Sequence, residues 1–224
     1  MFTEISWNKI IFGERWLTLD DTRTRIISAA MKAVREYGLE GVRIQNVSDL
    51  AGISPGALYR HFNSKDQLIE ECFTYVDKQA AEIFEHLKFN PVAMAADPIG
   101  TVKSLWLPYF RFWVAHPDET VFYHRFRDST FFPKYHETRD TSYFNSFVGM
   151  VHTFKATFPR LKTINQDLLW LHILTCTVLY AKYVVEGVLP DDQETEDTVF
   201  RLLCTGLSGY LKPEKAKKGK RIEK

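Results

Sequence analysis

The sequence predicts an all-α protein in which an N-terminal three-helix helix-turn-helix domain precedes a larger helical bundle. Three observations support this fold class. Apolar residues recur at helical spacing through most of the chain, strand-like alternation and hairpin signals are absent, and two short helical segments flank a tight glycine turn near the N-terminus. With 224 residues, 45% of them hydrophobic, the chain can bury a sizeable core without cross-links.

The first two helices are defined by their apolar spacing and by the glycines that end them. From Arg23 onward, apolar residues repeat at helical spacing until Gly38, which is placed as a C-terminal stop. A short second helix over 44–50 has its apolar residues on one face and ends at Gly52. That glycine lacks a Cβ, so it can adopt the left-handed conformation of a sharp turn.

Two capping signals predict where the third and fourth helices begin. Ser54 followed by Pro55 is typical of an N-cap with a proline in the first turn, and it opens a short third helix. Ser64 with Gln67 forms a capping box, which opens a long fourth helix that continues to Leu87.

The rest of the chain is rich in aromatic residues and is punctuated by prolines. Asn-Pro and Asp-Pro pairs bracket an expected loop over 90–98. We expect helices at 99–115, kinked at Pro108, and at 118–128, 139–157, 164–186 and 194–211. The stretch 168–185 is apolar enough to suggest a membrane span, but Lys182, His172 and two threonines interrupt it, which favours a buried helix.

Charge is unevenly distributed along the chain, although the formal net charge is only +1. Residues 22–65 contain seven basic and three acidic side chains, whereas residues 66–211 contain 13 basic and 19 acidic ones. The last 13 residues contain seven basic and two acidic side chains. This asymmetry suggests a basic N-terminal module that could meet phosphates and an acidic body that would not, although the charge alone favours a solvated surface.

The third short helix is the most informative segment for function. Leu58 and Phe62, four residues apart, would face inward, while Tyr59, Arg60 and His61 would lie on the exposed side. No acidic residue occurs between positions 52 and 63, as expected for a helix that approaches phosphates in the DNA major groove. This pattern leaves two interpretations open, a DNA-reading helix and a solvated helix face.

The same segment resembles the DNA-binding domain of the tetracycline-repressor-like (TetR) family. The resemblance is carried by T-R-T-R-I-I-S-A-A from Thr22, by Tyr37-Gly38, and by V-S-D-L-A-G-I-S-P-G-A-L-Y-R-H-F-N-S-K-D-Q-L over 47–68. It covers about a fifth of the chain but is dense and specific. It implies a DNA-binding transcription regulator, most often a repressor, with an effector site in the helical body.

The resemblance also implies roles for individual residues. Tyr59 and His61 match positions that contact the DNA backbone, and Lys65 matches a lysine that reaches a phosphate. Among the positions that face base edges, only Arg60 could make a bidentate contact to guanine. The residues expected at the DNA are Arg43, Gln45, Ser54, Pro55, Gly56, Ala57, Tyr59, Arg60, His61 and Lys65.

Three of these positions depart from the family pattern. Arg43 stands where the family usually has a threonine or serine that caps the second helix, so Arg43 could instead touch a phosphate. Pro55 replaces a common lysine, and Ala57 replaces a common threonine and leaves a methyl group that could pack on a thymine methyl. We therefore expect sparse base readout, with more weight on backbone contacts and DNA shape.

The aromatic body suits either core packing or a largely apolar ligand cavity with a few orienting polar groups. In the family that the chain resembles, the middle helices enclose an effector site, so we expect a cavity for a small-molecule effector there. The residues expected to line it are Trp106, Tyr109, Phe110, Trp113, Phe126, Phe147, His152 and Trp170.

The last two helices are more apolar than the surface of a monomer would tolerate, and the family uses their equivalents to build a four-helix bundle across a two-fold axis. We therefore expect a homodimer through these helices, with two recognition helices about one DNA turn (~34–36 Å) or a multiple of it apart.

The expected organisation has four parts. Residues 1–21 form an N-terminal extension, 22–67 the DNA-binding domain, 68–211 the effector-binding and dimerisation domain, and 212–224 a basic flexible tail. Within the extension, Lys9 and Arg15 could form an arm that enters the minor groove, or the segment could pack on the body.

Several function classes are disfavoured. The common nucleotide-binding, hydrolase and metalloprotease motifs are absent, none of the seven histidines has an acid three residues before it, and we expect no enzyme activity, metal or cofactor. The three scattered cysteines and the lack of a secretion signal favour the cytoplasm and no membrane partner.

The expected function is a sequence-specific transcription regulator, a repressor released from a palindromic operator by a small, largely apolar ligand. The alternative is a helical effector-binding or scaffolding protein that does not use its three-helix head on DNA.

Overall fold

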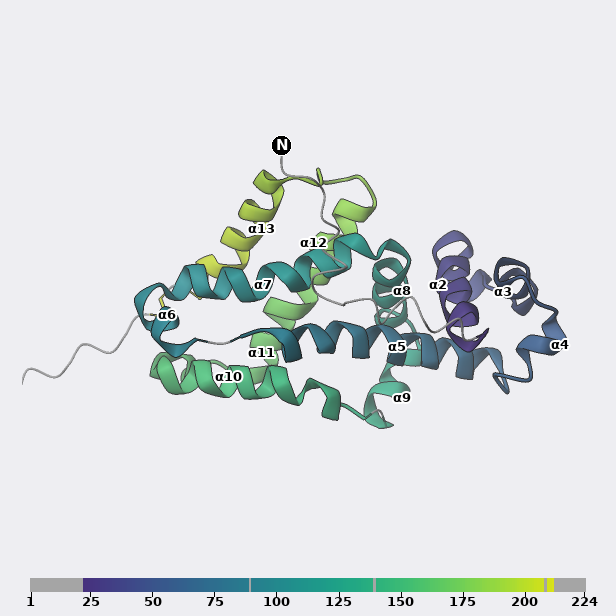
Figure 1. Cartoon of the computed structure of the whole chain (residues 1–224), viewed down its shortest axis with the longest axis horizontal. Helices are drawn as coiled ribbons and strands as arrows, with labels where there is room; N and C mark the ends of the chain where they lie inside the picture. The colour runs from purple at the N-terminus through teal and green to yellow at the C-terminus, as the bar shows by residue number, and fades with distance from the viewer. Residues whose placement is uncertain (1–21, 89, 139, 208, 212–224) are drawn as a thin grey trace, which may run out of the picture.

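The computed structural model describes residues 22–211, apart from 89, 139 and 208, and every regular element within these ranges is a helix (Figure 1). The all-α fold class is therefore confirmed. The N-terminal extension with Lys9 and Arg15 and the basic tail over 212–224 lie outside the described residues.

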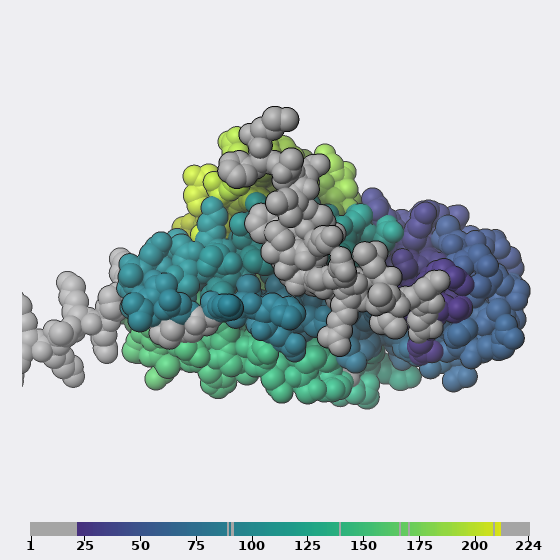
Figure 2. All heavy atoms as spheres, viewed as in Figure 1, coloured from purple at the N-terminus to yellow at the C-terminus, as the bar shows by residue number. Residues whose placement is uncertain are grey.

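Four helices form the N-terminal part, at one end of the molecule (Figures 1 and 2). They are α2 (Thr22–Gly41), α3 (Ile44–Ala51), α4 (Pro55–Leu58) and the long α5 (Lys65–His86). Within α2, Gly38 has φ 77° and ψ 164°, so the regular helix ends where the sequence predicts a stop and one further turn follows. All four predicted helices in this region are confirmed.

The body consists of the remaining helices. They are α6 (Pro91–Ala96), α7 (Pro98–Ala115), α8 (Pro117–Arg127), α9 (Phe131–Thr138), the 3-10 turn η2 (Ser142–Phe144), α10 (Asn145–Thr157), the 3-10 turn η3 (Pro159–Thr163), α11 (Gln166–Trp170), the π-helical turn η4 (Leu171–Thr175), α12 (Cys176–Val185) and α13 (Gln193–Thr205). Helix α5 continues from the N-terminal part into the body, between α7 and α10 (Figure 1).

The two parts share one continuous core, because α2 packs directly on α8. Polar contacts reinforce this packing at its edge. The guanidinium of Arg125 on α8 donates to the carbonyl oxygens of Val34 and Arg35, and Arg35 in turn forms an ion pair of 2.9 Å with Asp118. A movement of α8 would therefore be transmitted to α2.

Two short helices occur where the sequence predicts loops. Asn90 caps α6 by accepting from the backbone N–H groups of Val92 and Ala93, so the Asn-Pro pair opens a helix and does not form a simple turn. In α9, Pro133 occupies the first turn, where its missing N–H is not needed. The expected helix over 139–157 correspondingly begins later, after η2.

The predicted helix over 164–186 is interrupted by η4, whose hydrogen bonds are wider than those of an α-helix. At this point the hydroxyl of Thr177 donates to the carbonyl oxygen of Ile173 and so competes for a backbone acceptor. The last predicted helix, 194–211, is shorter in the structure, because α13 ends at Thr205 before the poor helix former Gly206.

The apolar stretch in the last part of the body is only partly buried, contrary to the expectation of a buried helix. The segment Asp167–Val185 is long and apolar enough to cross a membrane by composition, and 24% of it is buried in the single chain. Leu168 and Leu171 are more than half exposed. The predicted burial is wrong for the isolated chain because one side of this segment has no partner among the described residues.

Candidate functional site

The turn between α3 and α4 determines how the fourth helix is presented. Gly52 adopts the left-handed conformation, with φ 67° and ψ 36°, and its N–H bonds to the carbonyl oxygen of Asp49 at 3.2 Å. The N–H of Ile53 bonds to the carbonyl oxygen of Ser48 at 3.0 Å. These bonds satisfy the free carbonyls at the end of α3 and redirect the chain sharply into α4.

Helix α4 is short and has distinct inner and outer sides. Its N-cap Ser54 accepts from the N–H of Ala57 at 3.2 Å, which confirms the predicted cap. Regular α-helix ends at Leu58, and hydrogen-bonded turns continue to Phe62. Leu58 and Phe62 are 0% and 1% exposed, whereas Tyr59 is 51% exposed. The inner residues therefore anchor the segment in the core, while its outer side remains exposed to solvent.

The beginning of α5 follows directly and is also capped as predicted. Ser64 accepts from the N–H of Gln67 at 3.1 Å, and the Gln67 side chain accepts from the N–H of Asn63 at 2.7 Å. Lys65 occupies the first position of this helix and is partly exposed. A cation at a helix N-terminus opposes the helix dipole, so local stability does not explain this lysine.

Arg23 on α2 contacts both the end of the α4 segment and α5, a role that the sequence did not reveal. Its guanidinium donates to the carbonyl oxygen of His61 at 2.7 Å, pairs with the carboxylate of Glu71 on α5, and lies 4.3 Å from the centre of the Phe62 ring. The residue occurs in the T-R-T-R run, but its partners are 38 and 48 positions away and have no local signal. The contact fixes the end of the α4 segment against both neighbouring helices.

The predicted DNA-contacting residues lie on or directly beside α3 and α4 and at the beginning of α5, at the end of the molecule away from the body (Figures 1 and 2). The exposed members are Arg43, Gln45, Ser54, Gly56, Tyr59 and Arg60, and the partly exposed ones are Pro55, Ala57, His61 and Lys65. Arg43 precedes α3 without a side-chain cap, as expected, and Gln45 donates to Asp49 at 2.7 Å.

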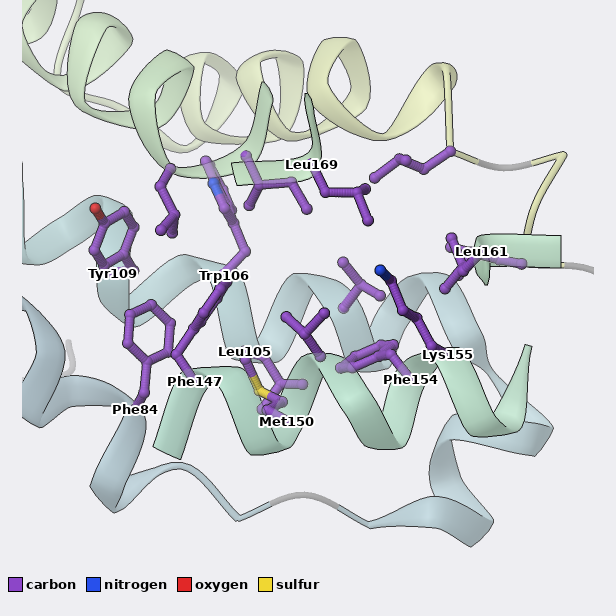
Figure 3. Close-up of a pocket in the computed structure, with 16 residues that line it drawn as sticks. Phe84, Leu105, Trp106, Tyr109, Phe147, Met150, Phe154, Lys155, Leu161 and Leu169 are labelled. Atoms are coloured by element: carbon purple, nitrogen blue, oxygen red, sulfur yellow. The ribbon is translucent and has the colours of Figure 1, made fainter. Parts of the chain in front are cut away.

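A second candidate site is an apolar cavity with about 100 Å³ of interior space in the body, between α5, α7, α10 and the α11–η4 segment (Figure 3). Sixteen residues line it, and three of the predicted ligand-contacting residues, Trp106, Tyr109 and Phe147, are among them.

Three other predicted ligand residues lie outside this lining because they are used in the core. Phe110 is stacked on Trp106 with ring centres 4.9 Å apart, and Phe126 is stacked on Phe73 at 4.6 Å. Trp113 is 0% exposed and packs against Tyr123 and its own neighbours on α7. These rings follow the simpler expectation for helical aromatics, that of core packing.

His152 and Trp170 complete the predicted set. His152 is exposed, because it follows Val151 by one residue and is rotated by ~100° around α10 from the cavity side. Nothing can be said of the Trp170 side chain, which lies outside the described part of the structure. The sequence analysis missed Lys155, although its spacing from Phe147 and Val151 puts the three on one face of α10.

The polar groups of the cavity's aromatic residues are already engaged or turned away. The indole N–H of Trp106 donates to the Thr177 hydroxyl at 2.9 Å. The Tyr109 hydroxyl points away from the other lining side chains (Figure 3), and burial raises its pKa well above the ordinary value of 10.0, which keeps it protonated.

A buried polar contact links α5 to the segment that leads into α10. The hydroxyl of Tyr143 in η2 donates to the Asp77 carboxylate at 2.7 Å, and that of Tyr123 on α8 donates to the same carboxylate at 3.3 Å. Asp77 is 1% exposed. Helix α5 is thus bonded to two elements of the body.

Among the described residues, no group of three or more His, Cys, Asp and Glu side chains could hold a metal ion.

Comparison with known proteins identifies the N-terminal part. Residues 26–72 match the family model described as "Bacterial regulatory proteins, tetR family". The chain is 31% identical over 91 residues to the HTH-type transcriptional regulator TtgR of Pseudomonas putida, which covers 40% of this chain and 41% of that protein. It is 43% identical over 49 residues to the HTH-type transcriptional regulator UidR of Escherichia coli, over 22% of this chain and 25% of that protein. The chain therefore matches well under half the length of these relatives.

Solved structures extend the likeness to the whole fold. A TetR family transcription regulator from Marinobacter aquaeolei superimposes with a TM-score of 0.65 at 19% identity, over 81% of this chain and 93% of that one. A TetR-family transcriptional regulator from Haemophilus influenzae gives a TM-score of 0.62 at 18% identity, over 82% and 94%. At such low identity these matches support the architecture of the body and not its ligand.

Proposed function

We propose that the chain is a DNA-binding transcriptional regulator of the TetR type, which the family match over residues 26–72 and the likeness to TetR-family regulators support. It acts as a repressor that leaves a palindromic operator when a small, largely apolar ligand binds in the body. The observation that carries this proposal is the outer side of α4, which is exposed and free of acids while Leu58 and Phe62 hold its inner side. We expect the protein to act in the cytoplasm and to have no enzymatic activity.

In this proposal α4 enters the major groove. Arg60, which is exposed, reads guanine through its guanidinium, and Tyr59 and His61 contact the backbone on either side. Lys65, at the beginning of α5, and Arg43, before α3, reach phosphates. Pro55 and Ala57 offer the bases only small apolar surfaces, so DNA shape contributes a large share of the specificity.

The active form is proposed to be a homodimer. Support comes from apolar side chains that remain exposed on the last helices, notably Leu168, Leu171, Tyr183 and Leu202. Val199 and Leu203 on α13 are also apolar, but they are buried in the core of the single chain and are not available to a partner. The two-fold axis would place two α4 segments on a palindrome, about one DNA turn (~34–36 Å) or a multiple apart.

Release by ligand requires that the two conformations bind it differently, typically with a coupling of about 1–3 kcal/mol. Two connections support such coupling. Helices α5 and α10 both line the cavity, and the Tyr143–Asp77 bond joins the beginning of the α10 segment to α5. Arg125 joins α8 to the backbone of α2.

Gel shifts at two salt concentrations test the DNA-binding role, with promoter fragments that flank the protein's own gene. We expect binding whose affinity falls steeply as salt rises, because phosphate contacts release counterions. Lys65→Ala should weaken binding at low salt. Lys134→Ala, which removes the same charge from an exposed position on α9, should leave it unchanged. Absence of binding at low salt would favour the alternative, a helical effector-binding or scaffolding protein.

A further inference from the structure

The cavity in the body has an unusually simple chemistry. Fifteen of its sixteen lining residues are aliphatic, sulfur-containing or aromatic, and the sixteenth is Lys155. The indole N–H of Trp106 is bonded to Thr177, and the Tyr109 hydroxyl points away (Figure 3). A ligand with polar groups along its length would lose its hydrogen bonds to water on entering and find few replacements. The walls therefore select a molecule whose buried part is hydrocarbon.

Lys155 lies at one end of this cavity. Its ammonium nitrogen is directed into the space between α10 and the facing elements, and it lies beside Phe154 and Leu161 (Figure 3). The side chain is partly buried, and within the described part of the chain no carboxylate forms an ion pair with it. A partly buried cation on an otherwise apolar wall is a favourable partner for a single anionic group.

We infer that the cavity binds a straight-chain aliphatic carboxylate, with its head group at Lys155 and its hydrocarbon tail between Trp106 and Phe147. This inference rests on the proposed function, in which a ligand of the body regulates DNA binding, and specifies the class of that ligand. Neutral hydrocarbons would leave the cation without a partner, and amphiphiles with a cationic head would be repelled by it.

The length of the cavity limits the length of the tail. Phe147 and Lys155 lie eight residues apart on α10, which corresponds to ~12 Å along the helix axis. The aromatic end, formed by Phe84, Tyr109 and Phe147, closes the cavity opposite the lysine (Figure 3). Affinity should therefore rise with chain length, about fourfold for each added methylene, until the tail reaches this aromatic end. Longer tails should then gain no further affinity.

Isothermal titration of the full chain, stripped of bound lipid and without DNA, tests the inference. The probes are decanoate, decanol and decyltrimethylammonium, which share a tail and differ in the charge of the head, and octanoate, which shortens the tail. We expect decanoate to bind about three- to tenfold more tightly than decanol and decyltrimethylammonium to bind most weakly. Octanoate should bind about fifteenfold more weakly than decanoate. Equal affinity for decanoate and decanol would overturn the inference, as would no binding of either.

A pair of variants assigns the preference to one side chain. Lys155→Met keeps the length of the side chain and removes its charge, so the ratio of decanoate to decanol affinity should fall to about one while decanol still binds. Lys155→Arg should keep the preference. Lys134→Met, at an exposed position on α9, should also keep it. If the methionine variants at both positions change the ratio equally, Lys155 does not hold the head group and the inference is wrong.

A second measurement on the same protein sample distinguishes failure of this inference from failure of the proposed function. A gel shift with and without decanoate follows the titration. Decanoate binding without any DNA binding would refute the regulator and leave the ligand class standing. DNA binding by a chain that takes neither decanoate nor decanol would leave the regulator standing and refute the ligand class.

Discussion

Replacing Arg23 with alanine should lower the melting temperature of the chain by about 5–10 °C. Among the contacts of the side chain, three account for most of the expected loss. Its charged hydrogen bond to the His61 carbonyl contributes about 1.5 kcal/mol. Its position 4.3 Å from the centre of the Phe62 ring contributes about 0.5–1 kcal/mol. The ion pair with Glu71 adds at most about 1 kcal/mol, because both side chains are partly exposed.

These contacts sum to about 2–3.5 kcal/mol. For a chain of this size each kcal/mol shifts the melting temperature by about 2–4 °C. Circular dichroism during heating measures the shift. Glu71→Gln should lower the melting temperature less than Arg23→Ala, because it removes the charge of the ion pair and at most the hydrogen bond that Glu71 accepts from Gln67, while the contacts of Arg23 with His61 and Phe62 remain. Lys32→Ala, at an exposed position on the same helix, should change the melting temperature little. A shift for Arg23→Ala no larger than that for Lys32→Ala would refute the role assigned to Arg23.

Three further predictions concern the N-terminal part of the chain and the buried cysteines. Arg60→Ala should reduce the discrimination in favour of one guanine by about 1–3 kcal/mol. Lys65→Ala should lower the affinity for all DNA sequences alike and reduce the slope of log affinity against log salt concentration by about one. Equal effects of both variants on cognate and random DNA in gel shifts would contradict this division of roles. Ser54→Ala should destabilise the chain by about 1 kcal/mol in urea unfolding, since it removes the N-cap of α4, and an unchanged midpoint would show that the cap contributes nothing. Burial raises the pKa of the Cys72 thiol far above its ordinary 9.0 and that of Cys204 to about 11, so the folded chain keeps protons that the unfolded chain releases. The free energy of unfolding should therefore fall as pH rises from about 9 toward 11, and a constant value over that range would count against the burial of these thiols.

The head could be predicted from the sequence because its signals are local. Gly38, Gly52 and the caps at Ser54 and Ser64 each act within a few residues, and each is confirmed at its predicted position. By contrast, Arg23 owes its role to partners that are brought close only by the tertiary fold, so its position in the sequence gave no indication of them.

The body was harder to predict because aromatic residues at helical spacing suit a core and a cavity equally. Trp106 lines the cavity while Phe110, one turn later on the same helix, is packed in the core, and only the arrangement of the neighbouring helices separates them. His152 was chosen for its polarity, yet the helical period puts Lys155, and not His152, on the side of Phe147. On α10, helical spacing therefore identifies the residues that line the cavity better than residue type does.

The boundaries of the body helices were misplaced where proline and asparagine had two possible meanings. Asn90 with its following proline can bound a loop, as the sequence predicts, but the same pair is also an N-terminal helix signal, and in the structure it opens α6. The interruption at η4 has no local signal in the sequence, because the type of bond that the Thr177 hydroxyl makes to the carbonyl oxygen of Ile173 also occurs at Thr74 and Thr153 within regular α-helix.

Methylation protection of guanine N7 tests the central claim most directly, because this atom faces the major groove, where α4 is proposed to lie. The DNA would be a duplex selected by the protein from random sequences. The account predicts two protected clusters about one helical turn or a multiple apart, and loss of guanine protection in Arg60→Ala. Bound DNA with every guanine N7 still reactive, or protection that is unchanged in Arg60→Ala, would contradict it.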